Sequence, residues 1–576
     1  MIVGEAELLT LMSRCVALGE SAARAPRDQA RLNEAFIQGR QTGSMVHRSG
    51  VTQYRPDDWF DEEELPRVFL NKLISLRMTW VALMNRSRIS ATAYPAGPAP
   101  EDRYRAEVSN RVIRFMSEEE DTASKVQTVV GYGCDHGTSA LKVIYDPSED
   151  KVRWSALSIF DFLIDPTPEY TDAKWCTFDH WISLEEAESH WEQAGLSGAP
   201  PTTSRDVAGV TRDDQVLARE LWHLPCKKYP KGLYLYVVGG RVAEHDDYPY
   251  VKVDDSGHPQ YTLPIFVFRV RNIRGSAYGG TNITDCIPVQ RTVNEMNARL
   301  LSVQRKMSGV HVWLPRTAPP DWDPAIDSKL FYEEGHGGER PLFLEPPQPS
   351  ALVTSQRDYW ESQLPGLMAL NDRTVGQQTS AVSGVALETT IQLDAEKNAD
   401  ASKSLERMVL NAIKFQLDLV GMFYTAPRKM LITGGDAIDV QSFSGQDTMG
   451  VDVRLEVGSE LDQRSDVRAG KAEARQQAGL AAPLEVESAR DDPAVAYSRR
   501  AARMVISQFL EGESVDLSPG DILPAVLDRE IMFAMAVAMR DGRQDDWAAL
   551  HRLQEQAASL TPDTSGVSPA PQGETP

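Results

Sequence analysis

The sequence contains little cysteine and no cysteine motif. Five cysteines occur among 576 residues, at positions 15, 134, 176, 226 and 286. They are odd in number, and none forms a CxxC pair or a cluster with histidine, so neither a disulfide framework nor a zinc site is predicted. We therefore expect reduced thiols, no bound metal and no cofactor.

Long apolar runs are missing as well. The most apolar stretch, Ile531–Met539, is bounded by Glu530 and Arg540 and is far too short to cross a bilayer. Glu5 and Glu7 stand where the basic start of a signal peptide would lie. The expectation is a soluble protein with no membrane partner.

Positive charge is scarce. The chain has 60 Lys and Arg against 83 Asp and Glu, which gives a net charge of −23. Surfaces that hold nucleic acid electrostatically are basic, so this balance argues against a chain whose main role is to grip nucleic acid. It is compatible with a protein that lets nucleic acid pass without adhering to it.

Catalytic signatures are lacking too. No GxxxxGK[ST], HExxH or GxSxG occurs in the sequence. Residues 131–136 begin like GxGxxG, but His136 stands where the third glycine is needed. Cys134 and His136 could be imagined as a nucleophile and a base, yet such a pair beside glycines is more often incidental. We assign no catalytic residue and expect a protein that is not an enzyme.

What the sequence does contain is strong helical periodicity between Asn282 and Tyr424. A first helix is predicted from apolar residues spaced 4, 3, 4, 3 and 4 apart, namely Val289, Val293, Met296, Leu300, Val303 and Met307. An extended excursion, a second helix and a loop rich in Gly, Ser and Thr follow. The same spacing returns at Leu387, Ile391, Ala395, Asn398, Ala401, Leu405, Met408, Ala412, Phe415, Leu419 and Met422.

This last helix is expected to be very long. No Gly or Pro interrupts residues 385–420, so it could run uninterrupted for roughly 50–60 Å. A helix of that length needs neighbouring elements or subunits along it. The pattern favours a structural, oligomeric part over a catalyst.

The rest of the chain is predicted to mix helices and strands, as an α+β fold. With 576 residues, two to four domains are expected. Helices are expected over the first forty residues with a break at Pro26, over residues 65–85 and 106–129, and across 462–555, with Gly131, Gly133 and Gly137 interrupting the third. Ser183 is expected to cap a short helix. Strands are predicted at 89–93, 140–145, 154–165, 175–182, 216–224, 232–238, 265–270, 429–432 and 451–457, with a loop at 200–214.

Four segments resemble the portal proteins of tailed bacteriophages, most closely the short-tailed-phage branch. They are Leu65–Ile89, in which an R-x-x-x-N-K helix, with Asn71-Lys72 ending the motif, leads to a strand; Trp154–Trp181; Tyr278-Gly279 followed by Gln290 and Asn294; and Ser383-Gly384-Val385-Ala386-Leu387. Ser87 departs from the family pattern, which usually has proline there. The order and spacing of these segments over roughly residues 30–430 carry the resemblance.

The resemblance implies a ring of identical subunits, usually a dodecamer, at one vertex of the capsid in the virion. Double-stranded DNA would be packaged and ejected through its axis. The ring would contact the major capsid protein, the terminase, and later tail or adaptor proteins, after assembly in the host cytoplasm.

The resemblance also implies a portal architecture with a mixed α/β wing, a helical stem, a small β-containing clip, a long kinked central helix and a helical crown. Mapped on this chain, these are the wing at 1–280, stem helix 1 at 281–308, the clip at 309–350, stem helix 2 at 351–370, the tunnel loop at 371–383, the long helix and its return to the wing at 384–460, the crown at 461–560 and a disordered tail at 561–576.

Within the expected clip, two short β-like runs are candidates for contacts between subunits and for docking terminase or adaptor. They consist of His311, Val312, Trp313 and Leu314, and of Leu342, Phe343 and Leu344. A two-stranded hairpin is marginal alone, so strands from adjacent subunits could complete the sheet. The alternative is an ordinary hairpin lying on its own domain.

Candidate DNA contacts lie in the expected tunnel loop and stem. Arg373, Gln377 and Gln378 could face the channel, or they could belong to a plain surface loop. Arg299, Arg305 and Lys306 could form basic rings, or they could pair with acidic residues of a neighbour. Competing functions are another head–tail adaptor or helical scaffold of a virion and, despite the missing P-loop, a packaging ATPase.

Overall fold

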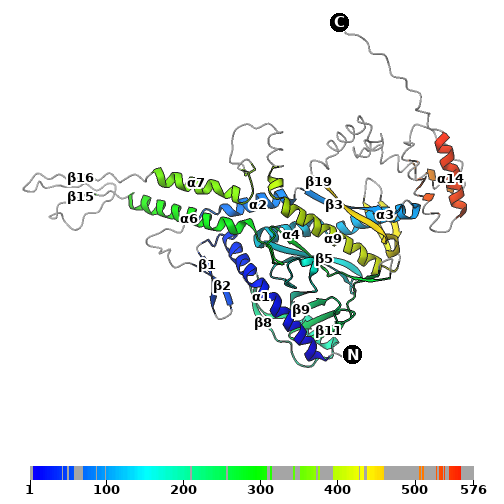
Figure 1. The fold of residues 1–576 in the computed structure, drawn as a ribbon, viewed down its shortest axis with the longest axis horizontal. Helices are drawn as coiled ribbons and strands as arrows, with labels where there is room; N and C mark the ends of the chain where they lie inside the picture. Colours follow the sequence, from blue (N-terminus) through cyan, green and yellow to red (C-terminus); the bar gives the residue numbers. More distant parts are fainter. Residues whose placement is uncertain are drawn as a thin grey trace, which may run out of the picture.

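The protein is an α+β structure with a projecting helical hairpin (Figure 1). The computed structural model describes residues 4–56 and 69–307 with short gaps, 351–371, 374–375, 393–459 with short gaps, the strands 312–313 and 342–343, and parts of 502–559. All strand pairs within these residues are antiparallel. Antiparallel sheets with separate helices confirm the predicted α+β class.

The first helix, α1 (Glu5–Ile37), is continuous, so the predicted break at Pro26 is wrong. Tertiary contacts hold the backbone on both sides of the proline. The Arg27 guanidinium donates hydrogen bonds to the carbonyl oxygens of Ile159 and Phe162, each at 3.0 Å. Packing and these bonds offset the loss of one helical N–H at the proline.

The predicted single helix over 106–129 is instead two helices, α3 (Pro100–Glu119) and α4 (Thr122–His136). They are separated at Asp121, which adopts a left-handed conformation with φ 45°. Its carboxylate accepts a hydrogen bond from the Ser124 N–H at 3.4 Å and so caps α4.

Gly131 and Gly133 lie inside α4 and do not interrupt it, contrary to the prediction. A Cβ at Gly133 would lie 2.4 Å from Cε1 of Phe268, so glycine is required there by close packing and not by a turn. Gly137 ends the helix with φ +83°, and its N–H donates to the Gly133 carbonyl at 2.7 Å.

Two sheets form the centre of the body. The larger has the order β11-β10-β9-β7-β6 with β8 paired to β9, and the smaller has the order β14-β4-β5. The larger consists of β6 (Phe162–Ile164), β7 (Trp175–Ser183), β8 (Thr203–Val207), β9 (Val210–His223), β10 (Leu233–Val238) and β11 (Arg241–Asp246). The smaller consists of β4 (Thr138–Asp146), β5 (Lys151–Ser158) and β14 (Ile265–Arg269).

These strands confirm most of the predicted strands. They correct two predictions, one of a strand and one of a loop. The segment 154–165 is divided between β5 and β6, which belong to different sheets. Residues 200–214, predicted to be a loop, contain β8 and the start of β9, paired through Asp206↔Thr211 and Val207↔Val210. Polar residues make backbone ladder bonds as readily as apolar ones, so alternation of apolar residues did not reveal this pair.

Further short elements surround the sheets. Ser183 caps α5 (Leu184–Gln193) as predicted, accepting from the Glu186 N–H at 3.3 Å. Four strands form separate two-stranded pairs, β1 with β2 and β12 with β13. The remaining bounds are β1 (Gly43–Arg48), β2 (Val51–Pro56), β12 (Val251–Val253), β13 (Pro259–Tyr261), α14 (Gln544–Ser559) and two short 3-10 helices, η1 (Tyr170–Asp172) and η2 (Gly445–Thr448).

Distant parts of the chain meet in a long strand pair. The helix α2 (Lys72–Asn85) begins after residues 69–71, which were predicted to be helical and are not. It leads into β3 (Ser87–Pro95), as predicted, and β3 pairs over its whole length with β19 (Val451–Ser459). The strands β17 (Arg428–Thr433) and β18 (Ile438–Phe443) pair with each other just before β19. The C-terminal strands therefore return to the N-terminal part of the body.

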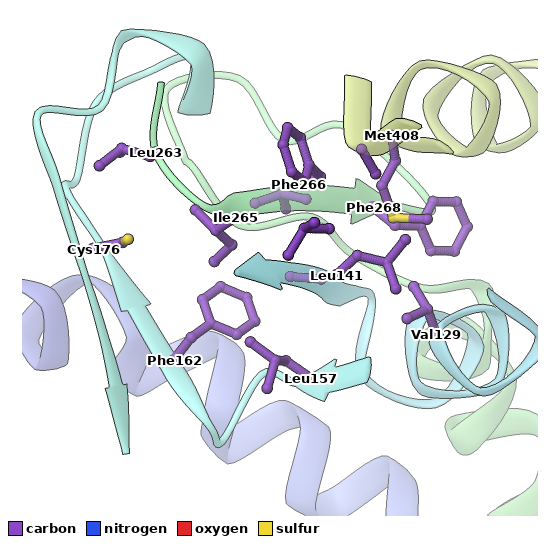
Figure 2. Packing of buried hydrophobic residues seen from close by; sticks show 14 of the residues in the cluster. Val129, Leu141, Leu157, Phe162, Cys176, Leu263, Ile265, Phe266, Phe268 and Met408 are labelled. Atoms are coloured by element: carbon purple, nitrogen blue, oxygen red, sulfur yellow. The ribbon is translucent and has the colours of Figure 1, made fainter. Parts of the chain in front are cut away.

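The main core lies around the smaller sheet (Figure 2). Phe266 and Phe268 of β14, Leu141 of β4 and Met408 of the long helix α9 (Ala399–Phe423) belong to this core, and Phe266 lies directly across from Leu141 in the sheet. All four side chains are at most 4% exposed. Each fully buried side chain of this size contributes roughly 1.5–3 kcal/mol to folding.

A charged pair joins the two sheets. Lys142 of β4 donates to both oxygens of Glu220 on β9 at 2.8 and 2.9 Å, and Glu220 also accepts from Trp222 at 2.9 Å. Burial alone would raise the pKa of the Glu220 carboxyl, but Lys142 and His180 outweigh it and hold that pKa below its ordinary value. Removing one partner would leave a buried unpaired charge, so the pair fixes how the sheets face each other.

The long helix lacks Gly and Pro over residues 385–420, and the resemblance implies a kink in it; its described part has one non-helical residue. Residues 393–397 are helical, the helix breaks at Asn398 (φ −99°, ψ 17°), and α9 then runs from Ala399 to Phe423. Its predicted apolar face is confirmed over α9, where Leu405, Met408 and Phe415 are buried. Positions 385–392 lie outside the described residues.

The glycine in α4 can be compared with one in an open helix. We expect Gly133→Ala to destabilise the protein by about 1–3 kcal/mol, because the added Cβ would collide with Phe268. Gly366→Ala, in α7 (Ala351–Leu367), adds the same methyl where no atom lies within 4 Å, and should stabilise by about 0.5–1 kcal/mol. Thermal unfolding of both variants measures the contrast, and equal shifts in Tm would contradict it.

Candidate functional site: the attachment of the helical hairpin

The feature that departs most from a globular body is a helical hairpin (Figure 1). Its helices, α6 (Asn282–Met307) and α7, lie side by side and project from the body. At the far end β15 (Val312–Trp313) pairs with β16 (Leu342–Phe343). The helix predicted from apolar spacing between Val289 and Met307 lies within α6 and ends at the same residue.

The segment before α6 is fixed by close backbone packing. A Cβ at Gly279 would lie 2.7 Å from the Arg271 carbonyl oxygen and 3.0 Å from that of Gly137, so only glycine fits. Beside it, Tyr278 is 1% exposed and its ring stacks on Phe162 at 6.4 Å between centroids. Tyr278 and Gly279 therefore pack the segment before α6 against the C-terminal end of α4.

Side-chain hydrogen bonds join the first turn of α6 to two other helices. The Thr281 hydroxyl donates to the Cys134 carbonyl oxygen at 2.5 Å. The Asn33 amide of α1 donates to the Asp135 carbonyl oxygen at 3.0 Å and to the Thr284 hydroxyl at 3.2 Å. Helices α1, α4 and α6 thus meet through polar contacts of fixed geometry.

Two turns further along α6, four carboxamides form a chain of hydrogen bonds, here called the amide relay. Gln290 donates to Asn294 at 2.9 Å, and Asn294 donates to Gln41 at 2.7 Å. Gln41 in turn donates to Asn71 at 2.9 Å. Gln290, Asn294 and Gln41 are at most 3% exposed. Loss of a partner in such a buried network costs about 1–3 kcal/mol for the group left unpaired.

The two ends of the amide relay are anchored on backbone carbonyls. Gln290 also donates to the Leu70 carbonyl oxygen at 2.9 Å, and Asn71 donates to the Ile37 carbonyl oxygen at 2.7 Å. The relay therefore ties α6 to the end of α1 and to the start of α2. Asn71, Gln290 and Asn294 belong to the segments that carry the resemblance, whereas no local pattern in the sequence marks Gln41.

Ion pairs hold the neighbouring helices. Arg77 of α2 makes two bonds to the Asp135 carboxylate, at 2.5 and 2.7 Å, and so fixes α2 against α4. Lys72 lies 2.6 Å from Glu361, which joins α2 to α7. Both helices of the hairpin are therefore attached to the body at their near ends.

Burial decreases along the hairpin away from the body. On α6, Cys286 and Val293 are fully buried, but Val303 is 42% exposed. On α7, Tyr359 and Trp360 are 57% and 38% exposed. The hairpin therefore presents large apolar side chains to solvent, in the middle of α7 and toward the end of α6, which is a common mark of a protein interface.

The predicted stem residues fall in the distal part of α6. Arg299 is exposed and pairs with Glu295 one turn earlier on the same helix. Arg305 and Lys306 lie in the last turn of α6, and their side chains are outside the described residues. The pairing of Arg299 with a residue of its own chain was not among the predicted alternatives.

The predicted clip and tunnel-loop residues are only partly described. Val312 pairs with Phe343, and Trp313 pairs with Leu342, so the two runs form a hairpin within one chain. His311, Leu314 and Leu344 lie outside the described residues, as do Arg373, Gln377 and Gln378. Their predicted contacts with DNA, terminase or adaptor stay predictions.

Cys134 and His136 lie at the C-terminal end of α4, which packs against α6. Burial, with the nearby Arg77 charge, lowers the pKa of His136 to about 4, and burial raises the pKa of the Cys134 thiol. A protonated thiol beside a neutral, enclosed imidazole is poorly suited to nucleophilic attack. Among the described residues, no helix combines the length and apolar content needed to cross a bilayer, and no group of His, Cys, Asp and Glu is placed to bind a metal.

Comparison with known proteins gives one match. Residues 20–248 match the family model of the phage P22-like portal protein. No curated protein matches the chain. The matched range contains two of the four segments that carry the resemblance, together with Gln41 and Asn71 of the amide relay, while Gln290 and Asn294 lie beyond it. The match confirms the resemblance to phage portal proteins over these residues, and its P22-like description is consistent with the short-tailed-phage branch.

Proposed function

We propose that copies of this chain form a ring at one capsid vertex, through which double-stranded DNA is packaged and ejected. The family match over residues 20–248 carries this proposal. The same ring would dock terminase during packaging and tail or adaptor proteins afterwards. Its role would be structural and not catalytic, within the virion.

The hairpin supports the proposal as the part that would surround the channel. Its helix α6 has 26 residues, which corresponds to roughly 40 Å. The exposed apolar residues of the hairpin would be covered by the hairpins of neighbouring subunits. The pair β15 and β16, which is marginal as an isolated hairpin, would be completed by strands of neighbours and would form the docking end.

The domain map inferred from the resemblance becomes part of the proposal. The body around the two sheets would be the wing, and β19 returns to it by pairing with β3. Helices α6 and α7 would be the stem, residues 309–350 the clip, 371–383 the tunnel loop and 461–560 the crown. The helix α14 lies within the last of these ranges.

Charge would let DNA move through such a ring. The net charge of −23 per chain would be multiplied by the number of subunits. Repulsion between an acidic wall and DNA acts over about 8 Å in physiological salt. Transient contacts from Arg373, Gln377 and Gln378, and from Arg299, Arg305 and Lys306, would guide the duplex without holding it.

Electron microscopy of the purified full-length chain tests the proposed function. We expect rings with a central channel wide enough for duplex DNA. A chain that stays monomeric at every concentration, with no annular particles in negative stain, would overturn the proposal.

The apolar face of α7 should matter for assembly and not for folding of the body. We expect Tyr359→Glu to reduce ring formation at least tenfold, because it places a charge in the proposed contact between hairpins. Gln356→Glu adds the same charge at an exposed polar position of the same helix and should assemble normally. Size-exclusion chromatography with light scattering measures assembly, and circular dichroism checks the fold. Equal assembly of the two variants would contradict the prediction.

The amide relay should behave as one coupled unit. Asn294→Leu leaves Gln290 and Gln41 without their shared partner and should destabilise the protein by about 2–4 kcal/mol. The double variant Gln41→Leu with Asn294→Leu should lose clearly less than the sum of the single losses.

Thermal unfolding of the single and double variants measures this coupling. Thr292→Ala, which removes only a bond to the Pro288 carbonyl within α6, is the matched control and should change Tm little. Strict additivity of the two relay variants would show that the amides act independently.

A further inference from the structure

One buried carboxylate joins the end of α7 to the start of the long helix. Asp394 has 0% exposure and accepts hydrogen bonds from the Asn371 backbone N–H at 3.2 Å and from the Asn371 side-chain amide at 2.6 Å. It also accepts from the Thr374 hydroxyl at 2.5 Å. Lys397 lies 3.7 Å away, at the edge of ion-pair distance. Three hydrogen-bond donors therefore converge on the Asp394 carboxylate.

One turn later, Asn398 extends the connection to α2. Its amide nitrogen donates to the carbonyl oxygens of Ala369 at 3.2 Å and of Asp394 at 2.9 Å. Its oxygen accepts from the indole N–H of Trp80 at 2.9 Å, and Trp80 is 1% exposed. The helix α2, the end of α7 and the start of the long helix are therefore fastened at one point.

These contacts explain the break at Asn398. The sequence around it contains no Gly or Pro. The backbone ladder continues across the break, from the Asn398 N–H to the Asp394 carbonyl and from the Ser402 N–H to the Asn398 carbonyl. The Asn398 side chain shares the Asp394 carbonyl with the backbone, and a side chain that enters the ladder in this way bends a helix. Tertiary contacts, and not helix-breaking residues, set this bend.

The partner segment is itself in an unfavourable conformation. Ala369 has φ +56°, a left-handed value that is costly for a residue with a Cβ. It ends α7 through bonds from the Ala369 N–H to the Gly366 carbonyl at 3.0 Å and from the Leu370 N–H to the Pro365 carbonyl at 2.9 Å. Such a conformation persists only where surrounding contacts over-determine it, and Asn398 supplies one of them.

We propose that Asp394, Asn371, Thr374, Asn398 and Trp80 form a clasp that couples the helical hairpin to the long helix. A displacement of α7 relative to the body would be transmitted through Asp394 to the start of the long helix. Asp394 is the central positioning residue, because it accepts all three bonds from Asn371 and Thr374 and a charged acceptor strengthens a hydrogen bond. The clasp operates within one chain, so it stands independently of ring formation and of DNA transport.

Asp394→Asn in the full-length chain tests the clasp. The substitution keeps the shape but replaces one acceptor oxygen with an NH2 donor that faces the donors of Asn371 and Thr374. We expect amide hydrogen exchange to become at least tenfold faster at residues 371–375 and 393–398. Thr374→Val removes one bond and should accelerate exchange there severalfold. Glu396→Gln, an exposed carboxylate in the same turn, is the matched control and should leave exchange unchanged.

The outcomes separate the clasp from a general loss of stability. Faster exchange confined to these two segments, with α4 and the sheets unchanged, supports the clasp. Unchanged exchange in Asp394→Asn, or equal acceleration in Glu396→Gln, overturns it. If Asp394→Asn does not fold, Thr374→Val decides, because unchanged exchange at 371–375 in that variant also overturns the clasp. Loss of rings in any variant would bear on the proposed function and not on this inference.

Discussion

The position of the projecting hairpin depends on the polar attachment of α6 to the body. An apolar helix face alone would tolerate a small rotation or shift, because many apolar side chains can fill similar spaces. The amide relay does not tolerate such a shift. Successive residues of a helix are rotated by about 100° about its axis, so a shift by one residue would separate Asn294 from Gln41. Backbone contact at Gly279 limits the approach from the other end. Together these contacts define one register and one direction for α6.

The same principle governs the bends of this structure. The change of direction at Asp121 uses a carboxylate cap, and the break at Asn398 uses a side-chain amide with a tertiary partner, Trp80. Neither bend is at a proline. Pro26, where a helix break was predicted, lies in an unbroken helix. Polar side chains therefore decide where these helices turn, Asp121 through a local partner and Asn398 through a distant one, and glycines such as Gly133 serve close packing.

Prediction from sequence was accurate where burial on one face dominates. The existence of α6 and its end at Met307 followed from apolar spacing, and β3 followed α2 as expected, because a repeating apolar period reports which face is buried. The strand β8 could not be foreseen, since its polar residues carry no such period. In the candidate site, Gln290 and Asn294 were found through a family resemblance, but their partner Gln41 became visible only in three dimensions. Contacts between residues far apart in sequence leave no local signal.

The pairing of β3 with β19 has a consequence for synthesis of the protein. Among the described residues β19 is the only partner strand of β3, and it is translated roughly 350 residues later. At 5–20 residues per second this delay is roughly 20–70 s. During that time β3 emerges from the ribosome with an open backbone edge, which is a template for pairing with other nascent chains. The helix α3, which packs against β3 and is translated directly after it, is available to cover this edge until residue 459 has been made.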